Sequence, residues 1–225
     1  ITLAGIDAQN VWMGDWLEVV SGVEFDYEEI DIPEDSLFGE SRVSQQFFVQ
    51  GDWFLGNALE LLTGYRVQND SGYGWHQAGR ISGLLRQNFL SGHQLAWRFG
   101  LGQSYKVPSL KELHYILDHS SFSPGYVVIG NKELVPEETL SYNLSSTLEL
   151  INGSQMELSL FKSDSKNFIE NEFSQQYTDE WGDDAYVYQN IEKVRTQGAD
   201  MSITLPFNDT SRFQFNYSYL DARDG

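Results

Sequence analysis

Long stretches in which apolar and polar side chains strictly alternate constrain this chain more than any other feature. Between residues 140 and 150, leucine or tyrosine occupies most even positions, and serine, asparagine, threonine or glutamate occupies the odd ones. Residues 17–27, 94–99 and 212–219 alternate in the same way. Successive side chains of a strand point to opposite faces, so each stretch is predicted to be a strand with one apolar and one polar face.

The connections between the predicted strands alternate in length. We expect strands near residues 1–9, 16–28, 43–55, 58–68, 77–89, 93–104, 139–151, 154–163, 192–205 and 211–222. Short turns rich in glycine, asparagine or proline are expected at residues 55–57, 90–92, 152–153 and 206–209, and long polar connections at 29–42, 69–76, 105–138 and 164–191. This order places the tight turns at one end of the sheet, which is typical of bacterial outer-membrane barrels.

Composition narrows the classes of function. The formal net charge is −19, which argues against a nucleic-acid partner. The chain contains no cysteine, so disulfides and thiolate metal sites are excluded. No apolar run is long enough for a membrane-spanning helix, whereas spanning strands need only about 9 to 11 residues with one apolar face. No motif of an enzyme can be singled out, and we expect no catalytic activity and no required cofactor.

One long connection carries motifs that resemble a known family. Residues 102–115 include a Lys-Val-Pro-Ser-Leu-Lys-Glu-Leu stretch, and residues 130–137 read Gly-Asn-Lys-Glu-Leu-Val-Pro-Glu. Together with residues 195–200 and 217–222, these segments resemble the TonB-dependent receptor barrel in the right order. The residues that carry the two loop motifs are Pro108, Ser109, Leu110, Glu112, Leu113, Gly130, Asn131, Leu134, Pro136 and Glu137.

The resemblance covers the chain from about Trp16 to its end and implies a fold, a location and partners. The fold is all-β, an antiparallel up-and-down transmembrane β-barrel of which residues 1–225 form a partial domain with about ten of roughly 22 strands. The plug domain is expected to lie outside this sequence, which reads as an internal fragment. The implied function is active uptake of a scarce nutrient across the outer membrane, with outer-membrane lipid, the TonB complex and a small-molecule nutrient as partners.

Two other classes of protein remain open. A soluble antiparallel β-sandwich that binds a ligand would show the same alternation, but its strands would be nearer 5 to 6 residues in length. A passive outer-membrane porin would have the same kind of wall. Two packed sheets would identify the sandwich, and the presence or absence of a plug domain separates receptor from porin.

The nutrient is expected to contact the loop at 105–138. Pro108 should end the preceding strand, and Ser109 should cap a short helix over Leu110 to Leu117, with Glu112 completing a capping box. An iron-siderophore, haem or cobalamin are the candidate ligands. A histidine between two such motifs can ligate haem iron, which makes His114 and His119 candidates, although Lys106, Val107 and Lys132 depart from the haem-receptor pattern. The candidate ligand-binding residues are His114, His119, Tyr105, Lys106 and Asn131.

Two acidic clusters offer a different hypothesis. Carboxylates at such density can hold calcium, but solvated acids are the more usual outcome and the spacing matches no EF-hand. Both readings stay open. The clusters consist of Glu28, Glu29, Asp31, Glu34 and Asp35, and of Asp179, Glu180, Asp183 and Asp184.

Overall fold

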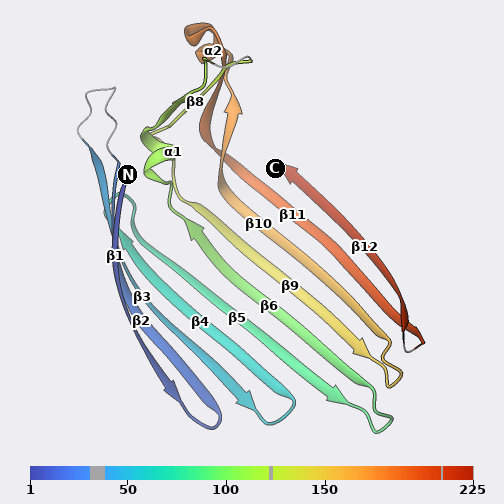
Figure 1. The fold of residues 1–225 in the computed structure, drawn as a ribbon. Helices are drawn as coiled ribbons and strands as arrows, with labels where there is room; N and C mark the ends of the chain where they lie inside the picture. The colour runs from blue at the N-terminus through green and yellow to red at the C-terminus, as the bar shows by residue number, and fades with distance from the viewer. Residues whose placement is uncertain (31–38, 122–123, 209, 225) are drawn as a thin grey trace.

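The computed structural model describes residues 1–30, 39–121, 124–208 and 210–224. Its main feature is one 12-stranded sheet whose ten long strands are neighbours in chain order, with β9 next to β6 and β12 next to β11, while β8 and β7 are added beside the upper end of β11. Figure 1 shows the long strands side by side as an open, curved wall with two small helices above it. The elements are β1 (Thr2–Met13), β2 (Leu17–Ile30), β3 (Glu40–Leu55), β4 (Leu59–Asp70), β5 (Gly74–Asn88), β6 (Gln94–Lys106), α1 (Leu110–His114), β7 (Ile116–Asp118), β8 (Tyr126–Ile129), β9 (Glu137–Glu149), β10 (Gln155–Phe173), α2 (Gln175–Trp181), β11 (Asp184–Asn208) and β12 (Ser211–Asp224).

All strands but β7 and β8 are long and pair with their neighbours in antiparallel order, as an up-and-down barrel requires. The exception to this order is β8, which pairs in parallel with the upper end of β11. The expected fold is therefore confirmed, and no second sheet packs on the first among the described residues. The strands that the structure describes form an open sheet that does not close on itself.

The register places the alternating residues on two distinct faces. Leu144 lies opposite Phe99 of β6 and Leu160 of β10, while Asn143 lies opposite Gly100 and Phe161. We call the face of Leu144 the apolar face and the face of Asn143 the polar face. The six residues expected to point outward all lie on the apolar face, and all but one are classed as exposed: Leu140, Tyr142, Leu144, Phe213, Phe215 and Tyr217.

Two of the four long connections predicted from the sequence were wrong. Residues 69–76 form a tight turn, because β4 continues to Asp70, β5 begins at Gly74, and the Asp70 carboxylate accepts hydrogen bonds from the backbone N–H groups of Gly72 and Tyr73. Residues 164–191 are mostly a hairpin, in which β10 and β11 pair as far as Phe173 and Tyr186. Apolar residues follow one another directly in this extension, as at Phe168 and Ile169 and at 185–188, so no alternation marked it as strand.

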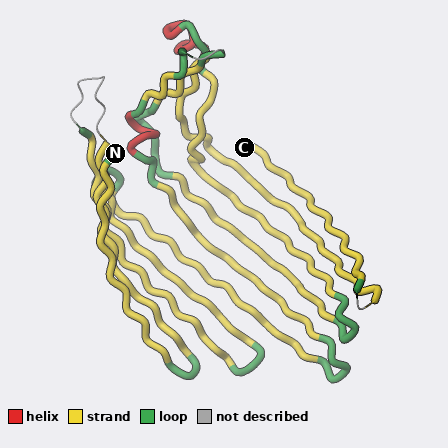
Figure 2. The backbone as a smooth tube through the Cα atoms, viewed as in Figure 1, coloured by secondary structure: helices red, strands yellow, loops and turns green. Residues whose placement is uncertain are grey.

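Of the other two long connections, the one at 29–42 lies mostly outside the described residues. The second, residues 107–136, folds into a compact unit at the upper ends of the strands. Figure 2 shows its helix and loops gathered at the end of the wall opposite the turns that join β1 to β2 and β3 to β4. Its helix is shorter than expected, since Tyr115 is extended (φ −89°, ψ 137°) and residues 116–118 pair with β8 instead. The expected strand end before Pro108 is confirmed, as β6 ends at Lys106.

Candidate functional site

The buried hydrophobic cluster of this chain lies at the mouth of the barrel and not in its wall. Leu110 and Leu113 of α1 pack with Leu134, which is 2% exposed, and with residues from two distant strands. Those partners are Ile30 at the upper end of β2 and Ile169 in the upper part of β10. We call residues 107–136 the mouth unit, because this cluster holds them between the two strands.

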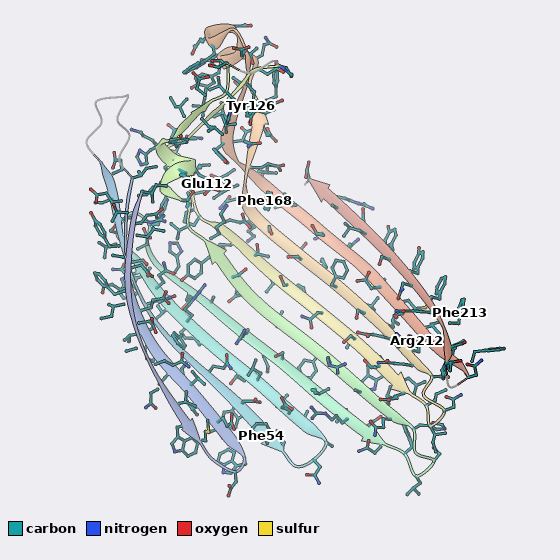
Figure 3. All side chains as sticks on the ribbon, viewed as in Figure 1. Phe54, Glu112, Tyr126, Phe168, Arg212 and Phe213 are labelled. Carbon is teal, nitrogen blue, oxygen red and sulfur yellow. The ribbon has the colours of Figure 1, made fainter. Side chains whose placement is uncertain are left out.

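Helix α1 begins with the capping box expected from the sequence. The Ser109 hydroxyl accepts from the Glu112 backbone N–H at 3.2 Å, and the Glu112 carboxylate accepts from the Ser109 backbone N–H at 2.8 Å. Lys106 donates to the same carboxylate at 2.7 Å. Burial alone would raise the pKa of Glu112, but the hydrogen bonds from Lys106 and Ser109 outweigh it, and the pKa lies below its usual value. Figure 3 shows Glu112 on this helix, above the wall.

Arg42 of β3 ties the mouth unit to the wall. Its guanidinium donates to the Pro108 carbonyl at 2.5 Å and to the Glu28 carboxylate at 2.6 Å, and lies 3.6 Å from Asp70. The side chain of Asp70 is 1% exposed, so Arg42 offsets a buried negative charge. The motif around Pro108 therefore has a structural partner that lies 66 residues away.

A second set of bonds fixes the far side of the mouth unit to β11 and β5. The Asn131 amide donates to the Tyr188 carbonyl at 3.0 Å, and Asn190 both donates to the Val135 carbonyl and accepts from the Val135 N–H. The Tyr73 hydroxyl, in the turn before β5, donates to the Leu134 carbonyl at 3.0 Å. Asn131 and Lys106, both expected to contact ligand, are engaged in bonds that shape the loop.

The two candidate histidines occupy different surroundings. The side chain of His114 is 12% exposed, and its Nδ1 lies 3.8 Å from Glu40 and has no hydrogen-bond partner. Burial lowers the pKa of His114, nearby Glu40 opposes that effect, and Lys132 adds to it. His119 instead stacks on Tyr126, with ring centroids 5.0 Å apart.

Tyr105, the remaining candidate, lies in a cluster that sequence reasoning did not find. Its hydroxyl donates to Gln68 at 2.7 Å, its ring centroid is 5.1 Å from that of His76, and the Arg66 guanidinium lies 5.1 Å from the same ring. The His76 Nε2 is buried without a hydrogen-bond partner. The cluster joins three strands just below the mouth unit.

A pocket of about 310 Å³ adjoins this cluster on the polar face. Phe48, Gln50, Arg66 and Arg80 line it, and Gly64 sits opposite Arg80 in the ladder. A Cβ at Gly64 would come within 3.1 Å of the Arg80 side chain, so the glycine leaves room for that arginine to lie across β4. Two guanidinium groups beside an aromatic ring can bind a planar, anionic ligand.

A sequence signal for this pocket was available. Arg66 and Arg80 are basic residues on the predicted polar faces of adjacent strands, in a chain that has only 14 basic residues against 33 acidic ones. Their proximity depends on the pairing of β4 with β5, which the alternation alone does not specify.

The acidic clusters do not form a metal site in the part of the chain that the structure describes, where no group of three or more potential ligands gathers. Asp179, Glu180, Asp183 and Asp184 lie around α2 without converging. In the other cluster Glu28 pairs with Arg42, whereas Asp31, Glu34 and Asp35 lie outside the described residues.

Comparison with known proteins decides the family. Residues 2–225 match the family described as TonB dependent receptor-like, beta-barrel. The chain belongs to this family. The resemblance of the loop motifs is thereby confirmed, and the TonB-dependent receptor barrel is a wall of the outer membrane whose apolar face meets lipid. No helix among the described residues is long and apolar enough to cross a membrane.

The receptor barrel has curated relatives at low identity. It is 25% identical over 182 residues to the iron-regulated outer membrane virulence protein of Vibrio cholerae, covering 78% of this chain and 27% of that protein. It is 24% identical to the ferrienterobactin receptor of Escherichia coli, covering 77% of this chain and 24% of that protein. The chain thus spans about a quarter of the length of these relatives.

Solved structures show the same fold. The siderophore receptor PirA from Pseudomonas aeruginosa matches with a TM-score of 0.81 at 16% identity, over 99% of this chain and 42% of that one. The copper transporter OprC matches with a TM-score of 0.69 at 15% identity, over 99% and 38%. The family consists of transport receptors and not of enzymes.

Proposed function

We propose that the full-length protein takes up an anionic iron chelate of the siderophore class, which enters at the mouth unit and is passed inward by energy coupled through TonB. Membership of the receptor family supports the coupling, and the names of the relatives in V. cholerae and E. coli support iron. A plug domain outside this sequence would make the contact with TonB.

The pair of arginines on the polar face is the observation that supports an anionic ligand. Arg66 and Arg80 line one pocket with Phe48, in a chain whose net charge is −19. The overall charge repels anions, so a local pair of guanidinium groups under the mouth favours a negatively charged chelate. Tyr105 and His76 extend this surface toward the mouth unit.

Haem is the competing ligand, and the surroundings of the two histidines favour the siderophore class. His119 stacks on Tyr126, and His114 is 12% exposed beside Glu40. Axial ligation by His114 would require its ring to leave these surroundings. The siderophore class needs no such rearrangement.

The experiment is uptake by cells that carry the full-length receptor as their only route for ferric enterobactin, used as an anionic probe. We expect Arg66→Gln with Arg80→Gln to weaken cell-surface binding at least about tenfold, since two charge-assisted contacts are lost. Arg98→Gln is the matched control, because Arg98 is on the polar face of β6 but pairs with Thr147 outside the pocket.

Two further measurements in the same cells test the TonB-dependent mechanism and the identity of the ligand separately. Deleting TonB should abolish uptake but not binding. Replacing both His114 and His119 with alanine should leave chelate uptake intact. Loss of haem-dependent growth in that double variant, with normal chelate binding in the arginine variant, would reject the siderophore proposal in favour of haem. Full uptake without TonB would reject the receptor mechanism.

A further inference from the structure

A groove of about 940 Å³ crosses the upper ends of the strands. Two consecutive rows of the apolar face line it. The lower row runs in register through Gln103, Leu140, Asp164, Arg195 and Arg223, and the upper row through Glu138, Lys166 and Lys193.

The groove lies just above the lipid-facing band. Leu140 is two residues from Tyr142 and four from Leu144 on the same face of β9, and the row of Leu144 continues through Leu160 to Ala199 and Tyr219. Two residues of strand span about 7 Å. The groove therefore lies at the level where the wall leaves the hydrocarbon core and meets the headgroups.

Basic side chains concentrate in this groove. Lys166 and Lys193 lie directly opposite each other in the ladder of β10 and β11, an arrangement of like charges that is destabilising by itself. Lys166 forms no ion pair among the described residues, and the one carboxylate near Lys193 is that of its neighbour Glu192 at 3.8 Å. An anion placed between the two ammonium groups would offset their repulsion.

The acidic residues that line the groove form no ion pair with Lys166 or Lys193. Asp164 forms ion pairs with Arg195 at 2.5 Å and with Lys162 at 2.9 Å. Arg223 forms an ion pair with Asp221 at 2.9 Å. The other two carboxylates of the lining belong to Glu138 and Asp224, and neither forms an ion pair among the described residues. Four basic side chains and three carboxylates thus line the groove, and among the described residues Lys166 and Lys193 have no carboxylate closer than the 3.8 Å between Lys193 and Glu192.

An aromatic residue at the other end of the groove fits the same level of the membrane. Trp75 is 72% exposed on the apolar face of β5. Amphipathic rings of this kind are enriched where the wall meets the headgroups.

We infer that this groove binds the phosphorylated headgroup of a lipid of the outer leaflet. Its phosphate lies between Lys166 and Lys193, with Arg195 and Arg223 able to contact a second phosphate along the lower row. The acyl chains descend along the apolar face past Leu140 and Leu160. A free phosphate would pair with the two lysines, but it has no acyl chains to contact the apolar face below the groove.

The test is mass spectrometry of intact complexes of the full-length receptor, stripped of lipid in neutral detergent and titrated with diphosphoryl lipid A. Lys166→Gln with Lys193→Gln should weaken binding by about tenfold or more, because each basic residue near a headgroup contributes about 1 kcal/mol. Lys111→Gln with Lys132→Gln removes the same charge from the mouth unit and should bind as the wild type does. Folding of each variant is checked by the gel shift between heated and unheated samples, and Arg223→Gln serves as a second probe should the lysine pair fail to fold.

Three outcomes would overturn the inference. The first is equal lipid binding by the wild type and the groove variants. The second is an equal loss in the Lys111 and Lys132 control. The third is displacement of the lipid by an excess of inorganic phosphate alone, which would make the groove a site for free anions.

Discussion

In the wall, Leu144 and Phe213 are 45% and 60% exposed, whereas in the mouth unit Leu134 and Leu110 are 2% and 4% exposed. The wall presents its apolar side chains to lipid and is held together by backbone ladders between neighbouring strands. The mouth unit buries its apolar side chains in the manner of a small water-soluble protein. Apolar side chains of this chain are thus exposed in the wall and buried in the mouth unit. The boundary between the two regions lies at the upper ends of the long strands.

The largest effect should come from Arg42, which joins the two regions. Arg42→Met leaves Asp70 buried without its counterion and should cost about 3 to 5 kcal/mol of local stability. Hydrogen exchange of the full-length receptor in lipid should rise across residues 107–136 and in the turn at 71–73. Adding Asp70→Asn to this variant should restore much of the protection, and no recovery would show that Arg42 acts mainly through Pro108.

A charge on the wall should act differently on the two faces. Leu144→Arg places a guanidinium toward lipid and should lower the free energy of unfolding by about 2 to 4 kcal/mol, while Asn143→Arg on the polar face should change it little. Reversible denaturation in lipid vesicles measures both. Equal losses for the two variants would mean that the assigned faces are wrong.

The difference between the regions also explains what the sequence could predict. The wall strands were found because lipid on one side and water on the other force alternation, as from Leu140 to Leu150. The upper hairpin of β10 and β11 extends beyond the wall and packs Ile169 against the mouth unit, so no alternation revealed it. The contacts of Arg42 with Asp70 and Pro108, and of Tyr105 with Gln68, join residues that the pairing of strands brings together. Local pattern carries no information about such pairs.

The cap of the mouth helix should have a smaller effect. Ser109→Ala removes the acceptor for the Glu112 backbone N–H and should destabilise the mouth unit by about 1 kcal/mol. Hydrogen exchange should rise in residues 109–115 while the exchange of the strands β4 and β5 is unchanged. Ser109→Asp, which keeps an acceptor at the cap, should retain most of the protection.

The smallest effect should come from His114. Because the pKa of His114 is lowered in the folded protein, the unfolded state binds the proton more readily, and the mouth unit loses stability as the pH falls through the range below the usual histidine pKa of about 6.5. Its protection should be full above pH 7 and decline toward pH 5.5, at constant ionic strength. The His114→Gln variant should lack this decline, and an identical decline in that variant would assign it to another group.

The central claim is that the wall and the mouth unit are held together by different forces. Its most direct test is hydrogen exchange of the full-length receptor in lipid bilayers, in which Leu113→Ala is compared with Leu144→Ala. We expect the first to raise exchange across residues 107–136 and to leave the long strands protected, since it opens a cavity in the buried cluster. The second should leave the mouth unit as in the wild type. If Leu113→Ala instead unprotects the wall strands along their length, or leaves the mouth unit unchanged, the mouth unit has no core of its own and the comparison fails.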